Sequence, residues 1–278
     1  MTQAELHALA MVWLAQDQLA MEVQVLDHRG SVPRETGTRM LVSETAVAGT
    51  IGGGHLELKA IEAARGWLAL GQPGPHDQTY ALGPALGQCC GGTVCLRTQV
   101  LSLDSLAAWP QPEPRFFLQL YGAGHVGRAV VRLLGDIDCE VQWIDERESE
   151  FPELALPGHI ERVCVEPVEA EVAEAPPGAC YLVLTHNHDL DLRITEAILR
   201  RGDFAFCGLI GSATKRARFV HRFEERSIAA AVLERLCCPI GLAGIDGKEP
   251  AVIAVAAVAQ LLQLPAALQQ APAGDPKR

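Results

Sequence analysis

The sequence predicts an α/β protein with a Rossmann-like, doubly wound parallel sheet in its C-terminal domain and a smaller α+β domain before it. Three observations support this fold class. Short apolar strands alternate with helical segments after residue 115. A glycine motif, Gly122-x-Gly124-x-x-Gly127, stands between one such strand and the helix that follows. A proline-rich stretch divides this part of the chain from the residues before it.

Residues 1–104 form the predicted α+β domain. Apolar residues at helical spacing predict an opening helix over residues 3–20. A glycine turn, Gly52-Gly53-Gly54-His55, leads into a second helix that runs to about residue 70. Strands are expected over residues 22–27, 39–42, 78–82 and 93–101.

Residues 105–114 form the predicted linker. The segment Trp109-Pro110-Gln111-Pro112-Glu113-Pro114 alternates proline with other residues. Proline fixes φ and removes a backbone donor, so the segment is expected to be stiff and extended.

Residues 115–278 form the predicted Rossmann-like domain. Apolar strands bounded by helices predict a parallel sheet covered on both faces. The strands are expected at 116–121, 140–144, 162–165, 180–184 and 204–210, and the helices at 124–134, 190–201, 213–226 and 250–264. The last helix is apolar and is a candidate contact between subunits of a homo-oligomer.

Composition excludes several classes of protein. The 278 residues are 49% hydrophobic and 21% charged, which is typical of a folded globular protein rather than a disordered one. The formal net charge of −11 disfavours nucleic-acid binding, since phosphate contacts need clustered Lys and Arg. No signal peptide or membrane span is apparent, so a cytoplasmic protein with no membrane contact is expected.

The nine cysteines are expected to be reduced in that compartment. Four of them lie in apolar runs and are interpreted as small buried hydrophobic residues: Cys139, Cys164, Cys180 and Cys207. The other cysteines considered stand beside Gly or Pro in predicted loops: Cys89, Cys90, Cys237 and Cys238.

The glycine motif has the context of a dinucleotide-binding loop. An apolar strand precedes Gly122, and a helical pattern follows Gly127. The next strand ends in Asp145, whose carboxylate is placed to accept hydrogen bonds from ribose hydroxyls. His125, inside the loop, either donates to an anion or is simply solvated.

Two further loops follow predicted strands of the same sheet and should border the same cleft. One carries His186 and His188, which are candidates for ligand binding, although their spacing matches no common zinc pattern. Asp189 or Asp191 is a candidate cap for the next helix. In the other loop, Ser212 can cap a helix whose first N–H groups bind an anion, helped by the basic pair that follows at positions 215 and 216.

The first domain carries two candidate sites. The N–H groups of Gly52, Gly53 and Gly54 form a possible anion nest with His55 beside it, or merely a tight turn. The segment Gln88-Cys89-Cys90-Gly91 combines adjacent thiols with glycine. A strained disulfide between neighbours is disfavoured, and zinc lacks further local ligands. A reactive thiolate that meets a soft metal or transfers sulfur fits better.

Several longer motifs stand in a characteristic order along the chain. They are Gly30-Ser31-Val32-Pro33-Arg34, Gly49–Glu57, Leu82–Gly92, Tyr121–Gly127, Thr185–Asp189, Gly208–Arg218 and Cys238–Leu242. Together they resemble the XdhC/CoxI family, and most closely its xanthine dehydrogenase accessory members, over roughly residues 5–264. Glu35 stands where the family pattern has a second proline, so this loop is expected to be less rigid.

The resemblance implies an accessory protein without turnover of its own. Such a chaperone would bind the molybdenum cofactor in its molybdopterin form, assist its sulfuration with a cysteine desulfurase, and deliver it to xanthine dehydrogenase. A thiolate at Cys89 or Cys90 would then lie near molybdenum, while a glycine nest or helix start holds the terminal phosphate.

Two other functions remain open at this point. The Rossmann half is also typical of an NAD(P)-dependent oxidoreductase, in which His186 or His188 would donate the proton and Asp145 would favour NAD. A nucleotide-sensing regulatory module would use the same crevice without chemistry. The sequence therefore leaves open whether the crevice holds the pterin cofactor, a separate nucleotide or nothing.

Overall fold

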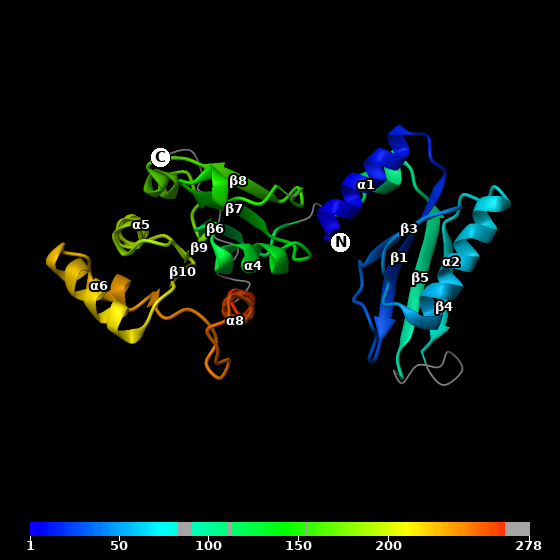
Figure 1. Ribbon diagram of the computed structural model, residues 1–278. Helices are drawn as coiled ribbons and strands as arrows, with labels where there is room; N and C mark the ends of the chain where they lie inside the picture. The colour runs from blue at the N-terminus through cyan, green and yellow to red at the C-terminus, as the bar shows by residue number, and fades with distance from the viewer. Residues whose placement is uncertain (83–90, 111–112, 154, 265–278) are drawn as a thin grey trace, which may run out of the picture. The chain divides into compact units, whose positions relative to one another are not determined.

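The computed structural model describes residues 1–82, 91–110, 113–153 and 155–264. The chain divides into two compact units, Met1–Pro112 and Glu113–Arg278, each with its own sheet (Figure 1). Among the described residues, no helix combines the length and the apolar character needed to cross a bilayer.

The first unit is built on a five-stranded antiparallel sheet of order β3-β2-β1-β5-β4. Its strands are β1 (Ala20–Arg29), β2 (Arg39–Ser43), β3 (Val47–Gly49), β4 (His76–Ala81) and β5 (Thr93–Val100). The sequence pattern does not predict β3, because three residues are too few to show alternation.

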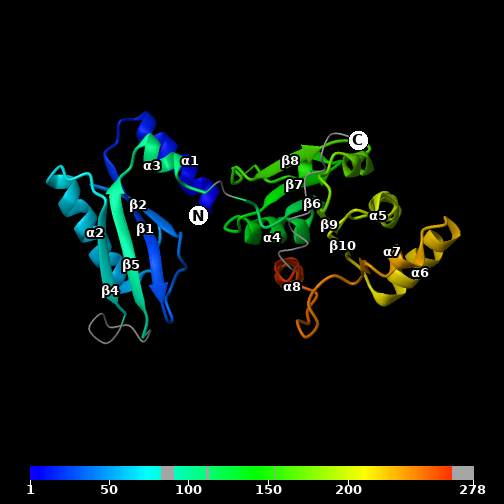
Figure 2. The ribbon, with the colours of Figure 1, turned by 180° about the vertical axis from the view of Figure 1, so that it is seen from behind.

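Helices pack on both faces of this sheet. Helix α2 (Gly54–Ala69) packs on the face formed by Met21, Val23 and Val25 of β1. The opposite face meets α1 (Gln3–Ala15) and α3 (Leu103–Ala107), which lie close together (Figure 2). Helix α1 ends at Ala15 rather than at residue 20, because the chain turns at Asp17, with φ 53°, and enters β1.

A buried hydrogen bond fixes the end of the first unit. Trp109 is 7% exposed, and its Nε1 donates to Oε2 of Glu22 on β1 at 2.6 Å. Gln99 Nε2 donates to the other oxygen of Glu22 at 2.8 Å. Residues 105–109 were predicted to belong to the linker; instead residues 105–107 complete α3, and Leu106 and Trp109 pack into the core of the first unit.

The second unit is a six-stranded parallel sheet of order β11-β10-β9-β6-β7-β8, which confirms the predicted Rossmann-like fold. The strands are β6 (Phe117–Tyr121), β7 (Glu140–Asp145), β8 (Ile160–Cys164), β9 (Cys180–Val183), β10 (Phe206–Leu209) and β11 (Leu236–Cys237). The order reverses between β6 and β9, which opens a crevice at the carboxyl ends of these strands.

Two hydrophobic cores cover the two faces of this sheet, as a doubly wound fold requires. Helices α4 (His125–Leu134) and α8 (Pro250–Leu262) pack together on one face. The other face meets the 3₁₀ helix η3 (Val168–Ala173), α5 (His188–Arg201), α6 (Ala213–Glu225) and α7 (Ala230–Leu233). A short 3₁₀ helix, η2 (Glu148–Glu150), follows β7.

Two predictions about cysteines in this unit are wrong. Cys164 was predicted to be buried, but it is exposed because β8 is the edge strand of the sheet. Cys237 was placed in a loop, but it lies in the edge strand β11, whereas Cys238 does follow the strand in a loop, where it is buried. The expectation of burial is confirmed for Cys139, Cys180 and Cys207.

Glu22 makes the stability of the first unit depend on pH. Burial raises its pKa above the usual 4.5, although the bonds from Trp109 and Gln99 and the charge of Arg39 oppose the shift. Because the folded-state pKa is raised, the contribution of Glu22 to stability is present below about pH 4.5 and is lost as the pH rises through the folded-state pKa.

We therefore expect Glu22→Gln to remove this pH-dependent loss, so that the variant gains free energy of unfolding relative to the wild type as the pH rises from about 4.5. Urea unfolding followed by tryptophan fluorescence across this range measures the difference. The exposed Glu44 provides the control variant, Glu44→Gln. A difference between Glu22→Gln and wild type that does not change with pH would contradict the assignment.

Candidate functional site

The loop between β6 and α4 lies at the carboxyl edge of the parallel sheet, and packing explains two of its glycines. A Cβ added at Gly127 would lie 1.9 Å from the carbonyl oxygen of Gly122. Gly122 has φ +117°, and its own Cβ would lie 2.5 Å from the Leu184 carbonyl oxygen. The first and third glycines of the motif are therefore required by the fold itself.

Gly124 is different. Its φ is −71°, a value open to any residue, and no described atom lies within 4 Å of an added Cβ. Gly124 caps α4 without a side-chain acceptor, and the first turn of the helix has no acidic residue. The first residue of α4 is His125, which is exposed. The open space beside Gly124 thus lets an anionic group of a ligand approach the helix start, where N–H groups lack partners within the helix.

Asp145 is not available as the predicted acceptor for ribose, because the protein itself satisfies its carboxylate. Oδ2 accepts from Ala123 N at 2.7 Å and from Arg147 Nη2 at 3.0 Å. Oδ1 accepts from Arg147 N at 3.0 Å and from Arg147 Nε at 2.9 Å. Burial works to raise the pKa of Asp145, but these bonds prevail and hold the pKa below its usual range.

The same arginine joins a chain of ion pairs that ties β7 to α4. Arg147 Nη1 lies 3.3 Å from Glu150 Oε1. The other carboxylate oxygen of Glu150 accepts from Arg128 Nη2 at 2.8 Å, and Arg128 also donates to the Glu150 carbonyl. Because Arg128 directly follows Gly127, these contacts hold the glycine loop against the end of β7.

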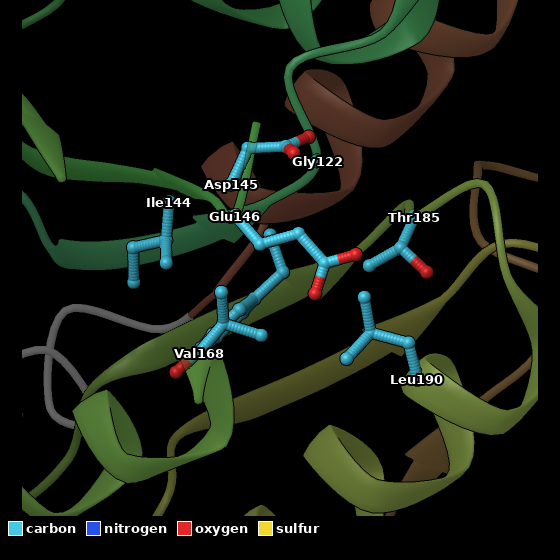
Figure 3. Close-up of a pocket in the computed structure, with 8 residues that line it drawn as sticks. Gly122, Ile144, Asp145, Glu146, Val168, Thr185 and Leu190 are labelled. Atoms are coloured by element: carbon cyan, nitrogen blue, oxygen red, sulfur yellow. The ribbon is translucent and has the colours of Figure 1, made fainter. Parts of the chain in front are cut away.

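A small pocket opens beside these residues at the carboxyl ends of β6, β7 and β9 (Figure 3). It contains about 180 Å³ of empty space, part of it open to solvent. The lining residues are Tyr121, Gly122, Ile144, Asp145, Glu146, Val168, Thr185 and Leu190. The pocket coincides with the crevice that the strand order predicts.

The loop after β9 presents two histidines at this edge. His186 and His188 are both exposed. The cap of α5 is Asn187, whose side chain accepts from the N–H groups of Asp189 and Leu190, and not Asp189 or Asp191 as predicted. No group of three or more His, Cys, Asp or Glu among the described residues has the arrangement of a metal site.

Asp191 instead turns inward and pairs with Lys215. Its Oδ2 lies 2.5 Å from Lys215 Nζ, and the two side chains are 2% and 9% exposed. Oδ1 of Asp191 accepts from the N–H and the hydroxyl of Thr185, at 3.1 and 2.6 Å. Lys215 was predicted to help bind an anion at the start of α6, but this buried pair engages its ammonium group.

Ser212 caps α6, as predicted, and accepts from Lys215 N at 3.2 Å. Lys215 Nζ also donates to the Ile210 carbonyl at 2.8 Å. The buried ammonium therefore links Asp191 of α5 to the loop that follows β10.

In the first unit, the glycine turn before α2 holds a carboxylate of the protein itself. Oε2 of Glu57 accepts from Thr50 Oγ1 at 2.5 Å, from Ile51 N at 3.1 Å and from Gly53 N at 3.1 Å. Gly52 N donates to Thr50 Oγ1 at 3.1 Å. The predicted nest therefore does not offer the N–H groups of Gly52 and Gly53 to a ligand.

The segment around residues 31–34 contacts two other motifs of the first unit. A Cβ at Gly52 would lie 2.5 Å from Pro33 and 3.6 Å from Cγ of Arg34. A Cβ at Gly92 would lie 2.3 Å from the Ser31 carbonyl oxygen. Gly54 and His55, which open α2, are exposed beside them.

The described residues on either side of positions 83–90 are held together near Ser31. Leu82 N donates to the Gly92 carbonyl at 2.8 Å, which holds together the two points where the chain leaves and re-enters the sheet. Gly91 is exposed, and no described atom lies within 4 Å of an added Cβ. The predicted site residues Gln88, Cys89 and Cys90 lie outside the described residues.

Sequence reasoning missed three residues that shape these sites: Glu57, Arg147 and Glu146. Glu57 lies in the first turn of α2, where an acidic side chain is favoured, so its position in the sequence could have predicted a contact with the helix start. Arg147 stands two residues after the strand-end carboxylate, which is also visible in the sequence. Nothing in the sequence distinguishes Glu146, since its position in the pocket depends on the turn after β7.

The strand order, the glycine loop and the crevice define the second unit as a Rossmann-type domain. Comparison with known proteins gives the family. Residues 118–261 match the model of the XdhC Rossmann domain, and residues 13–80 match that of the XdhC and CoxI family. The chain belongs to the XdhC/CoxI family, as the motifs predicted.

Two individual proteins are similar over most of the chain. The uncharacterised protein YqeB of Escherichia coli (strain K12) is 31% identical over 251 residues, which are 87% of this chain. The chain spans only 42% of that relative's length. A crystal structure of a protein described as a xanthine dehydrogenase from Bacillus halodurans shares the fold, with a TM-score of 0.75 and 20% identity, covering 99% of this chain and 98% of that one.

An added methyl group is expected to have different effects at Gly127, where it meets the backbone, and at Gly124, where it does not. We expect Gly127→Ala to lower the free energy of unfolding of the second unit by about 3 kcal/mol, because the methyl group meets a backbone oxygen that cannot move aside. We expect Gly124→Ala to change it by less than about 0.5 kcal/mol. Urea unfolding followed by circular dichroism measures both, and similar losses in the two variants would contradict the distinction.

Proposed function

We propose that this protein is an accessory protein of xanthine dehydrogenase maturation that carries the molybdenum cofactor as cargo. The observation that carries the proposal is Gly124, which the fold does not require but which opens the start of α4 to an anion. The terminal phosphate of a molybdopterin would be such an anion. Membership of the XdhC/CoxI family supports the choice of cargo.

The crevice is less well suited to an NAD-dependent oxidoreductase. Asp145, the residue expected to accept from ribose, is engaged by Arg147 and Ala123 N. A general acid needs a positioned proton donor, whereas His186 and His188 are exposed at the cleft edge. These features favour binding over hydride transfer, and we assign both histidines, with His125 and Ser212, to contacts with the cargo.

We assign the sulfur and metal chemistry to the segment Gln88-Cys89-Cys90-Gly91 of the first unit. Cys89 and Cys90 would supply a soft thiolate for molybdenum and a site where a cysteine desulfurase delivers sulfur. The close approach of Gly92 to Ser31 and the exposure of Gly91 support the assignment. Gln88 and His55 are proposed as polar contacts to the cargo while the thiols act on it.

The proposed partners are xanthine dehydrogenase and a cysteine desulfurase, in the cytoplasm. We also propose that the protein forms a homo-oligomer. Val255 and Leu262 of α8 are 47% and 44% exposed, and an apolar surface of this kind supports a contact between copies.

The thiol assignment predicts a specific defect. We expect the double variant Cys89→Ala/Cys90→Ala to remain folded but to bind the molybdenum cofactor at least about tenfold more weakly, a loss of about 1.4 kcal/mol. The measurement is an anaerobic titration with cofactor released from a purified molybdenum hydroxylase, followed by activation of cofactor-free xanthine dehydrogenase.

Cys164→Ala, which changes an exposed thiol of the second unit, is the matched control and should behave as the wild type. Unchanged binding and unchanged activation in the double variant would sink the thiol assignment. A wild-type protein that fails to bind the cofactor and instead transfers hydride to or from NAD(P) would overturn the proposed function as a whole.

A further inference from the structure

A buried ion pair lies behind the histidine loop, His186-Asn187-His188, which joins β9 to α5. Its members are Asp191 of α5, which is 2% exposed, and Lys215 of α6, which is 9% exposed. Lys215 Nζ lies 2.5 Å from Asp191 Oδ2 and also donates to the carbonyl of Ile210, directly after β10, at 2.8 Å. A buried ion pair is weak evidence for stability, since the desolvation of both charges offsets their attraction. Its role is better sought in what the carboxylate holds in place.

The other oxygen of Asp191 holds Thr185, which directly precedes the histidine loop. Oδ1 accepts from Thr185 N at 3.1 Å and from Thr185 Oγ1 at 2.6 Å. The second contact is short and charge-assisted, and such bonds are stronger than those between neutral groups. A carboxylate serves Thr185 and Lys215 together because both of its oxygens accept, whereas an amide of the same size has one acceptor only.

The hydroxyl of Thr185 also reaches across the histidine loop. Thr185 Oγ1 accepts from Asn187 N at 3.3 Å and lies 3.0 Å from the Asn187 carbonyl oxygen. The Asn187 side chain in turn caps α5 by accepting from two of its first N–H groups, at 2.8 and 3.3 Å. The backbone is therefore tied on both sides of His186 and immediately before His188.

The two imidazoles lack ties of this kind. His186 and His188 are both exposed, and no described residue bonds to either ring. The positions of the rings therefore depend on the backbone that carries them. Ordering a loop at the moment of binding costs affinity, so a backbone that is fixed beforehand favours the binding of a ligand.

We propose that Thr185 is the positioning residue of the histidine loop: it ties the backbone around His186 to the buried pair of Asp191 and Lys215, and so sets where His186 and His188 meet the cargo. The inference rests on the proposed function, which assigns both histidines to the cargo. It deepens that function by naming the group that holds them in place.

Two substitutions at one position test this assignment in the full-length protein. Thr185→Val removes the hydroxyl while keeping the shape of the side chain, and Thr185→Ser keeps the hydroxyl. Amide order parameters of His186 and His188, measured by NMR relaxation on protein labelled with ¹⁵N-histidine, report on the loop without any ligand. We expect values of about 0.85 in the wild type and in Thr185→Ser, but below about 0.6 in Thr185→Val.

The same variants are compared in the anaerobic cofactor titration. We expect Thr185→Val to bind the molybdenum cofactor at least about fivefold more weakly than the wild type, and Thr185→Ser to bind it within about twofold of the wild type. The control is Thr195→Val in α5, whose buried hydroxyl has no hydrogen-bond partner among the described residues. This control should change neither the order of the loop nor the binding.

A Thr185→Val protein with an ordered loop overturns the assignment, as does a Thr185→Ser protein that loses as much order as Thr185→Val. Loosening of the loop without loss of cofactor binding also rejects it, because the histidines would then not need to be held. These outcomes are distinct from failure of the proposed function. A wild type that does not bind the cofactor overturns the carrier function, whereas the order parameters still decide whether Thr185 holds the loop.

Discussion

The close approach of α4 to β6 is the constraint on which the second unit depends. With the Gly127 Cβ position 1.9 Å from the Gly122 carbonyl oxygen, a side chain of any size would push the helix away from the strand. The contact directs the start of α4 toward the carboxyl edge of the sheet. It also brings Ala123 N within 2.7 Å of Asp145, and Arg128 within 2.8 Å of Glu150. The crevice follows from this packing.

Internal partners satisfy most of the polar groups around the candidate sites. Glu57 fills the glycine turn of the first unit, Arg147 engages Asp145, and Asp191 engages Lys215. Each contact rigidifies a loop and removes a group that a ligand might have used. The space beside Gly124 remains open, together with the exposed side chains of His125, His186 and His188. All of these lie at the carboxyl edge of the same sheet.

The sequence predicted the elements with strong patterns and missed those without them. Strands β6 and β7 could be placed because apolar runs flank a glycine motif, and the roles of Gly122 and Gly127 followed from the same motif. The two-residue strand β11 has no detectable period. The engagement of Asp145 could not be predicted, because it depends on the turn that brings Arg147 back onto the strand end. Burial of Trp109 was hidden by the prolines that follow it.

The most direct test of the account is the identity of the small molecule that accompanies the protein. The full-length chain, purified under reducing and anaerobic conditions, would be examined by native mass spectrometry and by metal analysis. The account predicts a phosphorylated pterin with molybdenum, bound to the wild type and diminished in Gly124→Ala. A nicotinamide dinucleotide in its place, bound in stoichiometric amount, would contradict the central claim.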